Sequence, residues 1–532
     1  MADPHPESAG RRQMLRSAFA VGSITLLSRI SGLLREATHA NFLGTGMASD
    51  AFRIALLIPN VLRRLVGEGA VSTAFVPVFA RHVQTGDTPR IRLFAEKFFT
   101  LWTAILLLIT VAGMALAGSL LALGAHTDAW PPEKLELTAT LTRWLFPYLL
   151  LVGVSAVAGG ILNASGVFAL PSATPLLFNV CFIAAGWLLA GLFPGERAAF
   201  AFAIGVLLGG ILQATVLAPS LWRMGIRPCL RWPFDHAGVR EVLRLLIPGT
   251  FGAGIYQLNV FISSVLAMRI PQEGAVAALG FAGRLMEFVL GVFVFALSTV
   301  SLTTLSREAA ATDPAAFRAT LSEVLRLTGF ITIPSAVGLY VLREPIIRLL
   351  LESGRFGAES VRLTATAFQA YVPGLFLVGL SRVVTVAFYA RREIWTPVRV
   401  SAVNLAVNAI LSWALMGPLG HAGIALASTI AALVQAGWLV WEFTRREPDL
   451  VATGEILRSL AQTAAAALGM GLVCFWTLSF LPGGESGKFV FGLGVFGAIL
   501  AGAAAHFALA RLFGSSEAAL FLRALSRRIR RP

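Results

Sequence analysis

Long apolar segments follow one another along this chain, and short polar turns separate them. Each has the roughly 20 residues that an α-helix needs to cross a hydrocarbon core of about 30 Å. Charges, prolines and glycines bound fourteen such segments, so we predict fourteen membrane-spanning helices. They lie near residues 14–40, 47–80, 92–123, 136–163, 169–192, 198–222, 237–268, 274–306, 316–350, 358–390, 394–418, 421–445, 455–481 and 488–513.

The pattern predicts an all-α integral membrane protein that contains a faint internal repeat. An arginine precedes a glutamate in the second segment (Arg64 and Glu68) and again in the eighth (Arg284 and Glu287). Transporters are often built from such repeats, although apolar helices also resemble one another by chance. We therefore predict two pseudo-symmetric six-helix lobes and two C-terminal helices. The expected parts are an N-terminal tail (1–13), an N-lobe (14–222), a C-lobe (223–445), helices 13 and 14 (446–513) and a basic tail (514–532).

Composition excludes a soluble fold, and charge suggests an orientation. Hydrophobic residues make up 56% of the chain and charged residues only 13%, whereas soluble domains carry about 25% charged residues. The net charge of +15 does not indicate nucleic-acid binding here, because most basic residues lie in alternate short loops and in the tail. The positive-inside rule then places both termini in the cytoplasm. Exceptions on the opposite side cluster at Arg343, Arg348, Arg355 and Arg362.

Several arginines lie inside the apolar segments, where a charge is costly. Each would cost about 2.5–3.5 kcal/mol if it faced lipid at mid-bilayer, so these side chains must face protein or a wet cavity. They are Arg29, Arg35, Arg53, Arg63, Arg64, Arg143, Arg284 and Arg382.

Too few carboxylates lie in the same helices to neutralise these arginines. Spacing allows Arg64 to pair with Glu68, and Arg284 with Glu287, along one helix face. The remaining excess of guanidinium suits an external anion, since guanidinium binds phosphate in a bidentate manner. We therefore predict an anion site that contains Arg29, Arg35, Arg63 and Arg284. The competing interpretation is a buried ion-pair network that locks helices together.

Catalytic chemistry is not indicated. The chain contains no HExxH or CxxC motif, and its three cysteines are far apart. The nearest approach to a phosphate-binding loop, Gly483–Lys488, has Pro482 before it and Phe489 after it, where the motif needs glycine and Ser or Thr. We expect no enzyme activity, metal or cofactor. Transport work would come from a gradient, the membrane potential or a partner.

A set of local motifs resembles one known family. The chain reads Ser28-Arg29-Ile30-Ser31-Gly32-Leu33-Leu34-Arg35-Glu36, then Asp50-Ala51-Phe52, then Pro59-Asn60-Val61-Leu62-Arg63-Arg64 with Glu68-Gly69-Ala70, and later Arg284-Leu285-Met286-Glu287-Phe288. In this order and spacing it resembles the MurJ (MviN) lipid II flippases, over about the first 440 residues. These belong to the multidrug/oligosaccharidyl-lipid/polysaccharide exporter superfamily.

The resemblance implies a function and assigns roles to residues. It implies alternating-access transport of lipid II, an undecaprenyl-pyrophosphate-linked disaccharide-pentapeptide, to the outer leaflet for peptidoglycan synthesis. It carries cavity roles onto the four arginines of the anion site, and roles in conformational change onto Asp50 and Glu68. Loops 44–46 and 269–274 would move at the outer gate. Where several relatives have a sodium-binding aspartate, this chain has Ile262-Ser263-Ser264, which puts a sodium site in doubt.

Other functions and partners stay open at this point. The protein could flip another lipid-linked oligosaccharide, or act as a non-transporting scaffold of cell-wall synthesis. A multidrug exporter would need carboxylates in its cavity, and a membrane glycosyltransferase would need a large outer domain, so both are disfavoured. We expect lipid II, membrane lipids and cell-wall synthesis proteins as partners, no nucleic acid, and a monomer. Energy source and gating order are left open, with the membrane potential as the simplest candidate.

Overall fold

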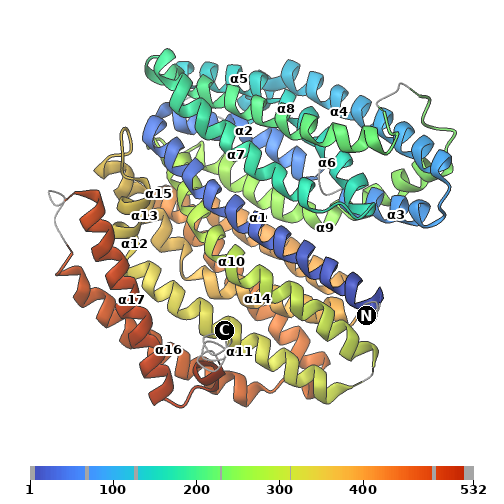
Figure 1. Ribbon diagram of the computed structural model, residues 1–532. Coiled ribbons are helices and arrows are strands. Elements are labelled where there is room, and N and C mark those ends of the chain that lie inside the picture. The colour runs from blue at the N-terminus through green and yellow to red at the C-terminus, as the bar shows by residue number, and fades with distance from the viewer. Residues whose placement is uncertain are drawn as a thin grey trace, which may run out of the picture. The chain divides into compact units, whose positions relative to one another are not determined.

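The computed structural model describes residues 6–65, 71–124, 130–227, 231–311, 313–481 and 487–520. These residues form helices, shown in Figure 1, and an isolated bridge between Ser353 and Phe356. The first helices are α1 (Pro6–Leu43), α2 (Met47–Leu62), η2 (Val71–Phe75), α3 (Val76–Gln84), α4 (Thr88–Gly124), α5 (Pro132–Leu145), α6 (Pro147–Ala164), α7 (Ala169–Leu189), α8 (Ala199–Arg223) and α9 (Ala237–Ala267). The others are α10 (Ala275–Ala310), α11 (Pro314–Val341), α12 (Arg343–Leu351), α13 (Ala358–Tyr371), α14 (Gly374–Ala390), α15 (Trp395–Arg446), α16 (Thr453–Leu478) and α17 (Lys488–Leu512).

Proline and glycine interrupt several of the predicted segments. Pro147 begins α6 directly after α5, because proline lacks the N–H that a continuous helix would need there. The pair α13 and α14 bends by 43° at Pro373. Within α15, Gly420 has φ +56°, a conformation that favours glycine, and separates the two predicted segments 394–418 and 421–445.

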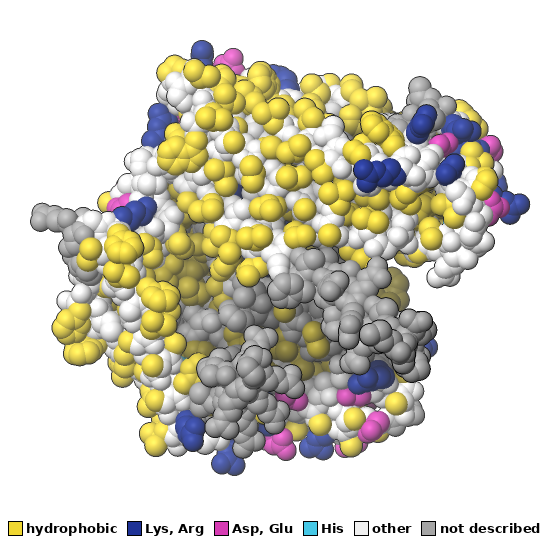
Figure 2. Space-filling model, viewed as in Figure 1, with side chains coloured by type: hydrophobic (Ala, Val, Ile, Leu, Met, Phe, Trp, Pro, Cys, Tyr) yellow, Lys and Arg dark blue, Asp and Glu magenta, His cyan; other side chains and the backbone are white. Residues whose placement is uncertain are grey.

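The prediction of a multi-pass helical membrane protein is confirmed, and the count of fourteen stays a prediction. Among the described residues, nine helices are long and apolar enough to cross a membrane, or ten if α13 and α14 form one bent span. Hydrophobic side chains cover much of the face shown in Figure 2. Large exposed residues such as Leu472 and Phe475 suit contact with lipid chains.

Contacts divide the chain into two units, each with its own core. Unit 1 comprises Met1–Ala277 with Ser353–Phe356, and unit 2 comprises Ala278–Glu352 with Gly357–Pro532. The predicted boundaries of the lobes, the C-terminal helices and the tails rest on the repeat and the charges, not on these contacts. They stay predictions.

Aromatic stacking fills the core of unit 1. The rings of Phe75 and Phe98 stack with centroids 4.3 Å apart, and Phe79 and Phe94 pack beside them. A second cluster joins Phe52, Phe182 and Phe202 from α2, α7 and α8. These contacts fix α1, α2, α7 and α8 as neighbours, and these helices carry several of the predicted site residues.

Small residues allow close helix packing in unit 2. A Cβ atom on Gly329 of α11 would lie 2.2 Å from Cδ2 of Leu460 in α16, and one on Gly502 of α17 would lie 2.5 Å from Sγ of Cys474. Larger side chains at these positions would force the helices apart. The glycines therefore hold α16 against both α11 and α17.

Candidate substrate-binding site

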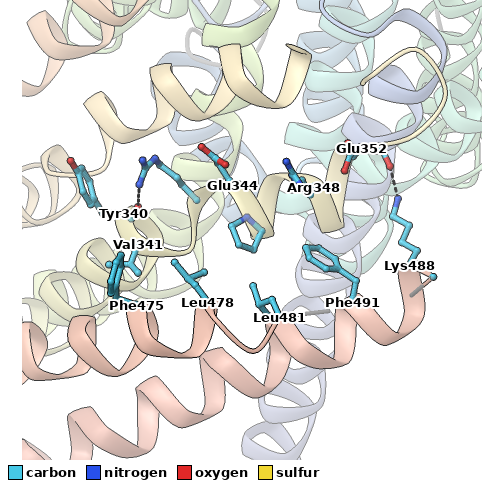
Figure 3. Close-up of a pocket in the computed structure, with 13 residues that line it drawn as sticks. Tyr340, Val341, Glu344, Arg348, Glu352, Phe475, Leu478, Leu481, Lys488 and Phe491 are labelled. Atoms are coloured by element: carbon cyan, nitrogen blue, oxygen red, sulfur yellow. Dashed lines mark hydrogen bonds between the residues drawn. The ribbon is translucent and has the colours of Figure 1, made fainter. Parts of the chain in front are cut away.

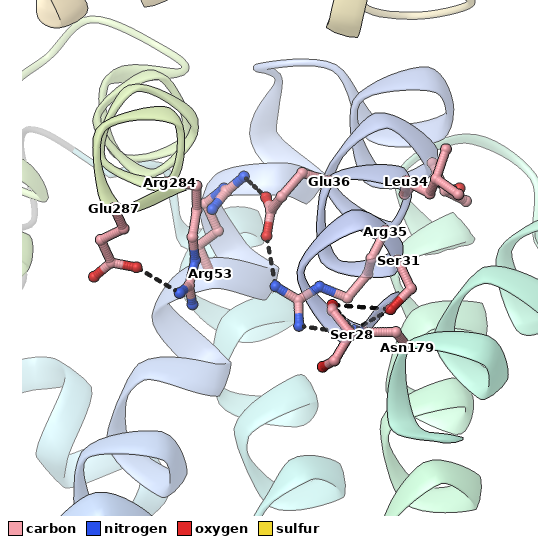
Figure 4. Close-up of polar contacts among 10 residues, drawn as sticks. Ser28, Ser31, Leu34, Arg35, Glu36, Arg53, Asn179, Arg284 and Glu287 are labelled. Atoms are coloured by element: carbon pink, nitrogen blue, oxygen red, sulfur yellow. Dashed lines mark hydrogen bonds and ion pairs between the residues drawn. The ribbon is translucent and has the colours of Figure 1, made fainter. Parts of the chain in front are cut away.

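Arg35 of α1 lies in a polar network inside unit 1 (Figure 4). Its guanidinium donates to Oδ1 of Asn179 at 3.2 Å, and Asn179 in turn donates to Oγ of Ser31 at 2.9 Å. The Arg35 guanidinium also lies 5.8 Å from the ring centroids of Phe178 and Phe182, within reach of a cation–π interaction. Helix α7 therefore holds the Arg35 side chain in place.

Glu36 bridges two arginines in the same network. Its Oε1 accepts from Arg35 at 2.8 Å, and its Oε2 accepts from Arg53 of α2 at 3.0 Å. All three side chains are largely buried, with exposures of 20%, 11% and 14% for Arg35, Glu36 and Arg53. Two guanidinium groups share one carboxylate here, which brings two positive charges close together.

Arg29 adds to that charge from the same helix. It precedes Glu36 by two helical turns, so both residues lie on the same side of α1, about 10 Å apart along the axis. Its side chain is half-buried, and within the described residues it forms no hydrogen bond or ion pair. Arg29 is therefore a cation with unused donors beside the Arg35 network.

Arg63 and Arg64 directly follow helix α2. The Nε of Arg63 donates to Oδ1 of Asn60 at 2.9 Å, and both arginines make further polar contacts. Glu68, which the sequence analysis pairs with Arg64, lies outside the described residues. That pairing stays a prediction.

Arg284 belongs to unit 2, on α10. Its Nη1 lies 2.8 Å from Oε2 of Glu287, the contact that their spacing predicts. Both side chains are partly exposed, at 37% and 42%. The other intramembrane arginine of this unit, Arg382, lies 3.9 Å from the ring centroid of Phe295. The role of Arg284 in binding an anion stays a prediction.

Asp50 accepts three hydrogen bonds inside unit 1. Its Oδ2 accepts from Nζ of Lys134 at 2.7 Å and from the amide of Gly274 at 3.0 Å, and its Oδ1 accepts from the amide of Ala277 at 2.8 Å. The last two donors lie at the start of α10, where a carboxylate caps free N–H groups and favours the helix dipole. Asp50 therefore anchors the first turn of α10 to α2 and α5.

The two predicted gate loops meet beside Asp50. A Cβ atom on Gly274 would lie 2.1 Å from the carbonyl oxygen of Thr45, and Gly274 has φ +82°. The amide of Met47 also donates to Oε1 of Glu273 at 2.8 Å. The loops 44–46 and 269–274 are therefore in contact. Two loops that move together at one gate would have to lie next to each other in this way.

Sequence reasoning missed partners that folding supplies. We expect Lys134 in a turn, but the structure places it in α5 with 5% exposure, because Pro131 and Pro132 start that helix earlier than hydropathy indicates. Glu36 is not predicted to bridge two arginines, nor Asn179 to hold Arg35. A polar residue inside an apolar segment is the one signal that could have marked Asn179.

Metal-ligating side chains do not gather in the described part of the chain. No group of three or more His, Cys, Asp and Glu there is arranged to hold an ion. At the position where the resemblance raises a sodium site, Oγ of Ser264 donates to the carbonyl of Val260 at 2.8 Å.

Comparison with known proteins decides the family. The family described as "Lipid II flippase MurJ" matches residues 39–494. The chain belongs to this family. The lipid II flippase MurJ of Burkholderia cenocepacia is 33% identical over 471 residues, which cover 87% of this chain and 90% of that protein. The probable lipid II flippase MurJ of Vibrio cholerae is 34% identical over 491 residues, covering 87% and 92%.

Solved structures agree on the fold. A lipid II flippase MurJ in an inward closed conformation aligns with a TM-score of 0.77 at 24% identity, covering 93% of this chain and 98% of that one. An inward-facing multidrug resistance transporter of the MATE family, from the MOP superfamily, aligns with a TM-score of 0.67 at 14% identity, covering 81% and 98%. Family membership and the apolar helices together make this chain a multi-pass inner-membrane protein.

Proposed function

We propose that this protein moves lipid II from the cytoplasmic to the outer leaflet of the bacterial inner membrane by alternating access. The observation that carries the proposal is the cluster of buried guanidinium groups in unit 1 of a chain that belongs to the lipid II flippase MurJ family. Lipid II presents a pyrophosphate, whose charge and geometry match that cluster. Both termini would lie in the cytoplasm, as the distribution of basic loop residues indicates.

Arg29, Arg35, Arg63 and Arg284 would bind the pyrophosphate, each with different freedom to do so. Arg29 has no partner to give up within the described residues. Arg35 is held by Glu36 and Asn179, so it would attract the pyrophosphate mainly through the electrostatic field of its positive charge. The Arg284–Glu287 pair is partly exposed, so an arriving phosphate could displace the carboxylate at low cost.

Asp50 would govern conformational change by holding the first turn of α10. Alternating access requires some helices to move while others stay packed. The three donors around Asp50 fix one end of α10, so motion of the rest of that helix would start beyond this anchor. Arg64, Glu68 and Glu287 would contribute charge pairs that form and break during the cycle.

The membrane potential is the energy source that we propose. The pyrophosphate of lipid II carries about two negative charges, and each is worth about 2.3 kcal/mol per 100 mV. With the interior negative, outward movement of the substrate is downhill. The empty protein would then return with its cavity arginines, which moves positive charge inward. We expect the protein to act as a monomer, with cell-wall synthesis proteins as possible consumers of its product.

Reconstituted vesicles test this function. The purified protein is placed in vesicles with lipid II in the inner leaflet, and exposure of the headgroup outside is measured with and without an imposed potential. We expect transport that slows when an ionophore collapses the potential at constant pH and sodium. Absence of lipid II exposure would reject the flippase, and unchanged transport at zero potential would reject only the energy source.

Variants test the proposed residues in the same assay. Arg29→Ala, Arg63→Ala and Arg284→Ala should abolish transport while the protein still inserts, and Lys at the same positions should restore only part of it because bidentate geometry is lost. Arg362→Ala, which changes an exposed arginine of α13, is the matched control. Full transport by all three alanine variants would contradict the anion site. Transport of a different undecaprenyl-pyrophosphate oligosaccharide at an equal rate would favour the broader substrate class.

A further inference from the structure

A pocket in unit 2 is lined by cations that the proposed function does not use. This pocket, of about 880 Å³, opens between α11, α12 and the adjacent ends of α16 and α17 (Figure 3). This volume falls within the usual range of ligand sites. Its lining is divided, with Arg343 and Arg348 on α12 and with Phe475, Leu478 and Phe491 on α16 and α17. The pocket is therefore amphipathic.

Three cations of this pocket form no ion pair with any carboxylate among the described residues. Arg343 donates to the carbonyl of Tyr340 at 2.7 Å, and Lys488 donates to the carbonyl of Glu352 at 2.9 Å. Arg348 is exposed and forms no hydrogen bond or ion pair with the residues that the structure describes. By contrast, Arg362 on the neighbouring helix α13 binds Glu359 through two hydrogen bonds. The three cations keep donors available for a ligand.

The charge of the lining favours an anion. Two carboxylates, Glu344 and Glu352, also line the pocket, and the cations outnumber them. Neither carboxylate accepts a side-chain hydrogen bond from Arg343, Arg348 or Lys488. A ligand with a phosphate could therefore accept hydrogen bonds from these three cations, which the two carboxylates do not accept.

The position of these arginines also needs an explanation. Arg343 and Arg348 belong to the cluster that departs from the positive-inside rule, on the side that the other basic residues assign to the outside. Helix α12 has only nine residues, too few to span a membrane, and it buries Ile347 and Leu351 while both arginines line the pocket. Arginines on a short amphipathic helix beside an apolar wall are well placed for lipid phosphates.

We propose that this pocket binds an anionic phospholipid of the surrounding membrane. Its phosphate contacts Arg348, with Arg343 and Lys488 toward the two ends of α12, and one acyl chain covers Phe475 and Leu478. A zwitterionic lipid would bring an ammonium group that the three cations repel, and free phosphate would leave Phe475, which is 68% exposed, uncovered. An anionic lipid satisfies both walls at once. The bound lipid links α12 to α16 and α17, independently of what the protein transports.

Native mass spectrometry of the purified full chain tests this site. The protein is reconstituted in phosphatidylcholine nanodiscs that contain a minority of phosphatidylglycerol, and the phosphatidylglycerol retained after release is counted. We expect Arg343→Gln/Arg348→Gln/Lys488→Gln to weaken retention about tenfold. The single variant Arg348→Gln, which removes no contact from the described protein, should weaken it severalfold. Arg362→Gln is the matched control and should retain the lipid as the wild type does.

Competition distinguishes the sources of phosphate. Inorganic phosphate at millimolar concentration should not displace phosphatidylglycerol, because it has no chain to cover the apolar wall. Lipid II has both a pyrophosphate and a lipid chain and is therefore the sharper competitor, and a site for bulk phospholipid should not release phosphatidylglycerol to it. Equal retention in wild type and triple variant, equal retention of phosphatidylcholine, or displacement by phosphate or by lipid II would each overturn the proposal. None of these readings depends on transport, so the flippase function can stand or fall separately.

Discussion

Two acid–base pairs of this protein have nearly the same length and very different surroundings. Lys134 and Asp50 of unit 1 are 2.7 Å apart, and Arg284 and Glu287 of unit 2 are 2.8 Å apart. The first pair has side-chain exposures of 6% and 1%, whereas the second has 37% and 42%. Distance alone would rank the two pairs as equal, but burial separates them.

The difference in burial assigns the two pairs different tasks. Removing one member of a buried pair leaves a charge without solvent, which typically costs about 3–5 kcal/mol. A partly exposed pair between neighbouring turns is worth less than about 1 kcal/mol, because water solvates either partner after separation. The Asp50 pair is thus suited to hold helices together. The Arg284 pair is suited to exchange its carboxylate for another anion.

Breaking the buried pair should have the largest effect. Asp50→Ala leaves Lys134 unpaired and removes the cap from the first turn of α10. We expect a loss of about 3–5 kcal/mol in stability, measured as a large fall in melting temperature in detergent. Asp50→Ala with Lys134→Met should recover part of that loss, because no unpaired charge remains. A melting temperature like that of the wild type in Asp50→Ala would show that this pair does not anchor the fold.

Removing the bridging carboxylate of unit 1 should have an intermediate effect. Glu36→Gln leaves Arg35 and Arg53 close together without a shared anion. We expect a destabilisation of about 1–3 kcal/mol, which added phosphate or pyrophosphate should partly reverse by taking the vacant position. Thermal unfolding with and without pyrophosphate measures both changes. Equal stabilisation of the wild type and Glu36→Gln by pyrophosphate would contradict the expected vacancy.

Changing the exposed pair should hardly alter stability. Arg284→Ala and Glu287→Gln should each change the unfolding free energy by less than about 1 kcal/mol. Their effects on transport should nevertheless differ, because Arg284 supplies the donor and Glu287 competes with the substrate for it. We expect lost transport in Arg284→Ala and tighter lipid II binding in Glu287→Gln. Weaker lipid II binding in Glu287→Gln would indicate that the carboxylate positions Arg284.

The smallest expected effect comes from Asp235, which lies in the loop between α8 and α9. The hydrogen bond from Lys97 holds the pKa of Asp235 below its ordinary value. Since the pKa is lower in the folded state, the stabilisation is present above the unfolded pKa of about 4 and is lost as pH falls through the folded value. Wild type should therefore be slightly more stable than Asp235→Asn at neutral pH. Melting curves at each pH should show this difference vanish in acid, and a constant difference would contradict the pairing.

The sequence was sufficient for the class of fold. Apolar length predicts the membrane helices, and the break at Gly420 falls between the predicted segments 394–418 and 421–445, because glycine acts through local backbone geometry. The break at Pro147 lies inside the predicted segment 136–163, which the sequence analysis treats as one helix. The sequence also did not place the start of α5 or the bend of α13 against α14. Helix ends depend on capping and on packing, which apolarity does not report.

The sequence by itself determined that the protein lies in a membrane, that it resembles the lipid II flippases, and that its intramembrane arginines need partners. The free-energy cost of placing a charged side chain in lipid depends on the residue type, so it can be recognised from the sequence alone. Only the tertiary structure decided which partners they have. Arg35 meets Asn179 across 144 positions and Lys134 meets Asp50 across 84, because contacts between helices depend on the rotation and crossing of each helix, which packing of the whole unit sets.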